Sequence, residues 1–138
     1  PAQCLKTISQ AQWLRVGVGH IDHLFQKIEF LMYSQKKDKW HRIRISLKRI
    51  RFVMDYALNM KKDFTSQEEY KMIGLVGKLL GDWHDRVIAV EILRSHASES
   101  TNAKQMKDDR ELLQRMGRDR RSLLAASRFY LRNLLANR

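Results

Sequence analysis

Apolar side chains recur along this chain at intervals of three and four residues, the spacing of helices that are buried along one side. The pattern predicts four helices, over about residues 9–33, 38–60, 65–96 and 103–136. Thr65 and Ser66 each stand three residues before a glutamate, the spacing of a capping box at a helix start. Long amphipathic helices with short connections pack most simply as an up-down bundle. The sequence therefore predicts an all-α fold, an up-down four-helix bundle in a single domain over residues 1–138.

The apolar stripe of each expected helix indicates which side chains form the core. Along the four helices in turn these are Trp13, Val16, His20, Leu24 and Ile28; Ile43, Leu47, Ile50 and Met54; Leu75, Leu79, Ile88, Ile92 and Leu93; and Leu112, Met116, Leu123, Tyr130 and Leu134. His20 and His23 could share a metal, but two histidines without further ligands are weak evidence. The Glu-x-x-His pairs typical of di-iron bundles do not occur in the sequence. We therefore expect no metal site and no cofactor.

The composition excludes several classes of protein. Cys4 is the only cysteine, so an internal disulfide is impossible. Every apolar run is interrupted by charge well before the roughly 20 residues that a membrane-spanning helix needs. The sequence also contains no glycine-rich phosphate loop and no evident pairing of a nucleophile with a base. We expect a non-catalytic, cytoplasmic protein.

The charge of the chain is large and unevenly distributed. The sequence has 27 lysines and arginines against 15 aspartates and glutamates, a formal net charge of +12. Residues 36–51 contain eight basic side chains and one acidic one, and residues 104–138 contain ten and four. The stretches 1–35 and 52–103 carry only +1 and −2. Two concentrated basic segments in one small domain indicate a polyanionic ligand.

Each basic segment places cations along one side of its expected helix. The first basic row consists of His41, Arg44, Lys48 and Arg51, and the second of Arg110, Arg121, Arg128 and Arg132. The first row runs beside the apolar stripe of its helix. Gln114, Gly117 and Ala125 share the side of the second row and leave room for a ligand near the backbone. Like charges at this spacing weaken a helix, so two such rows favour ligand binding over an ordinary solvated surface.

Two motifs carry a resemblance to a known family. Residues 41–52 read H-x-x-R-I-x-x-K-R-I-R-F, and residues 80–87 read L-G-x-x-H-D-x-V. Together they resemble the CHAD family, the conserved histidine α-helical domain, and Arg128-Phe129 with Leu134-Leu135 is a weaker third feature. The resemblance covers all four expected helices. It implies an all-helical protein that binds inorganic polyphosphate through basic side chains in a central cavity.

The resemblance also suggests individual site residues. The positions that match the basic motif are His41, Arg44, Lys48, Arg49 and Arg51, and the second row adds Arg121, Arg128 and Arg132. Asp85 and Asp82 would orient basic side chains within the site; the plainer alternative is a surface ion pair that contributes less than about 1 kcal/mol. Family members typically contain two four-helix units, whereas this chain has one set of motifs. The chain is then either half of a longer protein or one partner of a homodimer. A protein that binds polyphosphate is also expected to associate with polyphosphate granules.

Two other functions fit the same charge. The basic rows could hold the backbone of DNA or RNA, or the protein could be an adaptor that docks an acidic protein. Proteins that bind single strands usually add aromatic side chains on which bases stack. We place Phe52 and Tyr56 on another side of their helix from the first row. This arrangement favours a ligand made of phosphate without bases.

Overall fold

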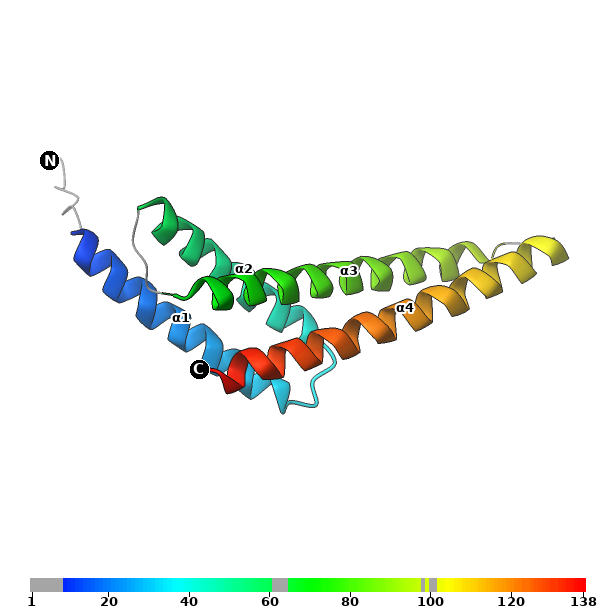
Figure 1. Ribbon diagram of the computed structural model, residues 1–138. Coiled ribbons are helices and arrows are strands. Elements are labelled where there is room, and N and C mark those ends of the chain that lie inside the picture. Colours follow the sequence, from blue (N-terminus) through cyan, green and yellow to red (C-terminus); the bar gives the residue numbers. More distant parts are fainter. Residues whose placement is uncertain (1–8, 61–64, 98, 100–101) are drawn as a thin grey trace, which may run out of the picture. The chain divides into compact units, whose positions relative to one another are not determined.

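The computed structural model describes residues 9–60, 65–97, 99 and 102–138, and within them the chain forms helices and no strands (Figure 1). The helices are α1 (Gln10–Met32), α2 (Lys39–Asn59), α3 (Gln67–Ala97) and α4 (Ala103–Ala136). Their ends lie within two residues of the predicted ones. The predicted fold class, an all-α protein of four long helices, is confirmed.

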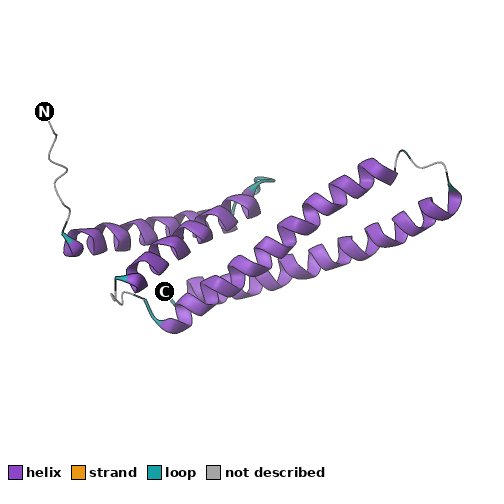
Figure 2. Ribbon diagram, turned by 90° about the horizontal axis from the view of Figure 1, so that it is seen from above, coloured by secondary structure: helices purple, strands orange, loops and turns teal. Residues whose placement is uncertain are grey.

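The described residues divide after Tyr70 into two compact units. In the first unit α1 and α2 run antiparallel and pack against each other. In the second unit α3 and α4 lie side by side as a long antiparallel pair in both views (Figures 1 and 2). Each pair therefore has the up-down order that was predicted.

Side-chain caps explain why the helices begin where they do. Ser9 Oγ accepts a hydrogen bond from the backbone N–H of Gln12 at 3.2 Å, and the Gln12 side chain accepts one from Ser9 N–H at 2.9 Å, a complete capping box. At the start of α3, Ser66 Oγ accepts from the N–H of Glu69 at 3.1 Å, as the sequence predicted. The Thr65 hydroxyl instead donates to Glu69 Oε2 at 2.7 Å.

The turn between α1 and α2 is held by Lys39, the first residue of α2. Its ammonium group donates to the carbonyl of Ser34 at 3.0 Å and to that of Met32 at 3.5 Å. A cation is favourable there because the last carbonyls of a helix lack intrahelical partners. Lys39 Nζ also lies 5.6 Å from the centroid of the buried Trp40 ring. These contacts fix the start of α2, the helix that carries the first basic row.

The core of the first unit comes from the middle of α1 and most of α2. Its large buried side chains are Ile21, Leu24, Phe25, Ile28 and Leu31 of α1 and Trp40, Ile43, Leu47, Ile50 and Met54 of α2. The predicted apolar stripe of α2 is thus confirmed at all four positions, and that of α1 at Leu24 and Ile28.

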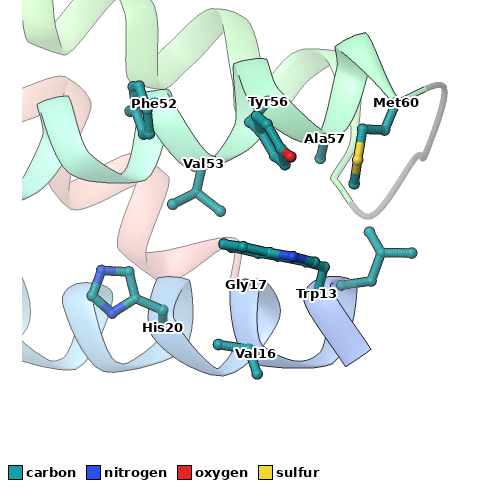
Figure 3. A pocket seen from close by; sticks show the side chains of 10 residues that line it. Trp13, Val16, Gly17, His20, Phe52, Val53, Tyr56, Ala57 and Met60 are labelled. Atoms are coloured by element: carbon teal, nitrogen blue, oxygen red, sulfur yellow. The ribbon is translucent and has the colours of Figure 1, made fainter. Parts of the chain in front are cut away.

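The prediction for the first half of α1 is wrong. Trp13 and Val16 are 47% and 63% exposed, and His20 is exposed as well. All three residues line an open apolar groove of about 340 Å³; Trp13 lies opposite Val53 and Tyr56 of α2, whereas the Val16 side chain points away from α2 (Figure 3). The rings of Trp13 and Tyr56 lie 5.8 Å apart. The periodicity of apolar residues predicts an apolar side of α1, but it does not predict how closely α1 and α2 pack at that end.

In the second unit, most of the buried apolar residues are not the predicted ones but lie on a neighbouring side of each helix. The buried apolar side chains are Ile73, Val76, Leu80 and Val90 of α3 and Leu131 and Leu134 of α4. Leu75, Ile88, Ile92 and Leu112 are exposed, contrary to the prediction, and Leu134 is the predicted position that is buried. Leu79, Leu93, Met116, Leu123 and Tyr130 are half-buried. Residues 72–80 of α3 are apolar or glycine on almost every side, so spacing alone does not select a stripe.

Gly19 offers a test of local helix stability. It lies inside α1, and a Cβ added to it would meet nothing within 4 Å. We expect Gly19→Ala to raise the free energy of unfolding by about 0.5–1 kcal/mol, because alanine loses less backbone entropy in a helix. Urea denaturation followed by circular dichroism measures this. The control is Gly17→Ala, whose Cβ would lie 3.4 Å from Val53 Cγ1 and whose gain should be smaller. A loss of stability in Gly19→Ala would contradict the prediction.

Candidate anion-binding site

The first basic row lies on α2 directly beside the core of the first unit. His41, Lys48 and Arg51 are exposed and Arg44 is half-buried. Three of the helix's apolar residues, Ile43, Leu47 and Ile50, are buried with at most 1% of their surface exposed. Because the buried side of α2 packs in the core, the helix cannot rotate, and the adjoining cations keep their positions along its edge. This is the placement that the sequence predicted.

Arg44, Lys48 and Arg49 keep their charges uncompensated. None of the three forms an ion pair or a side-chain hydrogen bond with any residue in the described ranges. Arg44 and Lys48 are four residues apart and repel each other, at a cost of a few tenths of a kcal/mol. A bound anion would relieve that repulsion.

Arg51 has a different environment from the rest of its row. Its Nε lies 4.0 Å from Asp55 Oδ2, and its guanidinium carbon lies 4.9 Å from the centroid of the Tyr70 ring. Its Nη2 donates to the Tyr70 hydroxyl at 3.5 Å, and that hydroxyl donates to Asp55 Oδ1. The cluster ties α2 to the start of α3 and offsets part of the Arg51 charge. Arg51 is therefore the member of the first row least suited to hold an external anion.

The second basic row lies on α4, and its four arginines are exposed. Ser127, Leu131 and Leu134 are buried along the same part of the helix. Arg121 and Arg132 have no carboxylate partner among the residues whose placement is described. The row thus presents positive charge to solvent within the second unit, as the first row does within the first.

The sequence predicts that two aspartates of α3 orient basic side chains. Asp82 is half-buried and Asp85 is exposed. Neither forms an ion pair or a side-chain hydrogen bond with a described residue. Their role as orienting groups stays a prediction.

A basic hollow between α3 and α4 was not foreseen. We call it the arginine hollow; it measures about 360 Å³ and contains Arg94 of α3 together with Arg118, Arg120 and Arg121 of α4. Gln114 and Gly117, which the sequence placed beside the second row, also line it. The three arginines at 118, 120 and 121 were a visible signal. Arg94 had none, because only the pairing of α3 with α4 brings it there.

The structure contains no sign of a metal centre or a membrane span in the part that it describes. No group of three or more histidine, cysteine, aspartate or glutamate side chains is placed to hold a metal there. No helix in those ranges combines the length and the apolar content needed to cross a bilayer.

Comparisons with protein-family models, curated proteins and solved structures found no match. Any function must therefore be argued from the charges and contacts of this chain.

Proposed function

We propose that this chain is a CHAD-like unit that binds inorganic polyphosphate, without catalysis, through its two basic rows. The observation that carries the proposal is that Arg44, Lys48 and Arg49 on α2, with Arg121 and Arg132 on α4, lack carboxylate partners within the described ranges. The sequence contains 15 acidic residues with which surface cations could pair. Clustered cations that lack a carboxylate partner repel one another without a ligand and are favourable with a polyanion.

The chemistry of the rows suits a chain of phosphates. Each arginine offers a planar fork to two phosphate oxygens, and Lys48 offers a compact charge that tolerates many geometries. Polyphosphate is flexible and carries about one negative charge per unit, so it needs closely spaced donors and little shape recognition. His41, Arg44, Lys48, Arg49, Arg121, Arg128 and Arg132 are the proposed ligands, with a smaller part for Arg51.

One observation favours nucleic acid as a second candidate. Phe52 follows Lys48 by four residues, so it lies close to the first row, and it is 73% exposed. Phe129, three residues before Arg132, is 60% exposed. Both side chains are exposed enough to stack on bases.

Salt dependence tests the first row. We expect Arg44→Ala/Lys48→Ala to weaken binding of labelled long-chain polyphosphate and to reduce the slope of log K against log salt by about 1–2, because two phosphate contacts are lost. The measurement is a fluorescence titration at several salt concentrations. Lys36→Ala/Lys37→Ala is the matched control, since it removes two exposed lysines just before α2. Equal changes in both variants would contradict a site on the row.

The same titration separates the two candidate ligands. If polyphosphate is the ligand, it should bind more tightly than single-stranded RNA of equal charge, and Phe52→Ala should leave its affinity unchanged. If RNA binds more tightly and Phe52→Ala weakens it by tenfold or more, the stacking of bases decides and the polyphosphate proposal fails.

A further inference from the structure

The arginine hollow differs from the basic rows in how its charge is arranged. The rows spread their cations over several helical turns. In the hollow, Arg118, Arg120 and Arg121 come from a single turn of α4, and Arg94 comes from the neighbouring helix α3. Four positive charges are therefore concentrated around about 360 Å³. That volume is at the small end of the range for ligand pockets, roughly 300–1,000 Å³.

Among the described residues no carboxylate pairs with these arginines, although Asp119 lies in the same turn of α4. None of the residues that line the hollow is acidic. Arg94, Arg118, Arg120 and Arg121 form no ion pair or side-chain hydrogen bond with a residue that the structure describes. Four guanidinium groups so close together repel one another, and a multiply charged anion between them would replace that repulsion with attraction.

The remaining residues of the hollow strengthen its preference for an anion. Val90, which is buried, and Leu113, which is half-buried, give it an apolar wall. Charges beside such a wall interact more strongly than charges in water, because the local dielectric constant is lower. The side-chain amide of Gln114 can donate two further hydrogen bonds.

Gly117 keeps the hollow open at the surface of α4. A Cβ built on it would lie 3.8 Å from Arg121 Nη1, so the Arg121 guanidinium group lies next to the bare backbone of this turn. A larger side chain at this position would extend toward the same space. The glycine thus lets a ligand approach the helix beside Arg121.

We propose that the arginine hollow binds a compact inorganic pyrophosphate group, held by the forks of several arginines at once. The group could be free pyrophosphate or the end of a polyphosphate chain, since both present the same oxygens. The second source rests on the proposed function, whereas the first does not. The rows would hold the extended part of a polyanion, and the hollow a short segment of high charge density.

Calorimetric titration of the whole chain with pyrophosphate tests the hollow. We expect one binding site in the wild type and an affinity at least tenfold lower in Arg118→Ala/Arg120→Ala, which leaves the second basic row intact. Lys104→Ala/Lys107→Ala is the control, because it removes the same charge from exposed positions of α4 and should change the affinity less than threefold. Absence of binding to the wild type, or equal losses in both variants, would overturn the proposal.

A second variant distinguishes a loss of pyrophosphate binding from a loss of folding. Gly117→Glu places a carboxylate beside Arg121 and replaces a glycine with a better helix former, so the helix content should be kept. It should also abolish pyrophosphate binding. Retention of wild-type affinity in a folded Gly117→Glu protein would rule out the hollow as the site.

Long-chain polyphosphate distinguishes this proposal from the proposed function. Binding of long chains without binding of pyrophosphate would refute the proposal for the hollow but not the proposed function of the rows. Binding of pyrophosphate without binding of long chains would refute the proposed function of the rows but not the proposal for the hollow. Polyphosphate with chemically blocked ends separates the two sources. A loss in Arg118→Ala/Arg120→Ala that is larger for free ends than for blocked ends would support the chain end as the ligand, and no loss with either form of the chain would support free pyrophosphate.

Discussion

Replacing Ile43 with alanine is expected to lower the free energy of unfolding by about 2–5 kcal/mol. Ile43 is fully buried in α2, among the apolar side chains of the first unit. Its truncation removes buried methyl and methylene groups and leaves a cavity that the surrounding helices fill only in part. Urea denaturation followed by circular dichroism gives the value. A loss of this size exceeds every other single stability effect considered for this chain.

Ile45→Ala provides the matched control on the same helix. Ile45 is half-buried, two residues from Ile43 and turned away from the fully buried stripe. The same atoms are removed, but water already reaches part of that side chain, so the expected loss is below about 1.5 kcal/mol. Similar losses at both positions would mean that the core of the first unit does not follow the stripe of α2.

The helix ends were predictable because they depend on neighbours in the sequence. The bonds that start α1 join Ser9 and Gln12, and the bond that starts α3 joins Ser66 and Glu69. The stripe of α2 was also predictable, since charged residues occupy the other sides of that helix and leave a single apolar direction. In α3 several directions are apolar, and the choice among them depends on packing rather than on spacing.

The candidate site likewise has a part that was predictable from local sequence and a part that was not. The rows on α2 and α4 follow from residues three and four apart, and the structure places them on exposed helix sides. The contact of Arg51 with Tyr70 spans 19 residues, and the arginine hollow joins Arg94 to residues more than twenty positions later. Such contacts depend on how two helices pair, which no local pattern specifies. The sequence therefore showed how much charge the site carries but not which arginines are already engaged.

The largest effect on binding is expected when both rows are disabled together. For a long polyphosphate that contacts both rows, Arg44→Ala/Lys48→Ala and Arg128→Ala/Arg132→Ala should each lower affinity about tenfold at roughly 0.1 M salt. The combined variant should lose about a hundredfold, because contacts at independent positions along one polyanion contribute additively to the free energy of binding. Fluorescence titration with the labelled chain measures all four proteins, and a charge-matched variant at Lys36, Lys37, Lys104 and Lys107 is the control.

Chain length and stoichiometry decide between one shared ligand and two separate ones. If one polyphosphate engages both rows, shortening it should at some length remove the effect of one pair of substitutions while the other pair keeps its own. If each row binds its own molecule, disabling one row should halve the number of bound chains and leave the affinity of the remaining site unchanged. That second outcome would contradict the binding of one polyphosphate to both rows, because additivity of free energies requires that one ligand lose both sets of contacts.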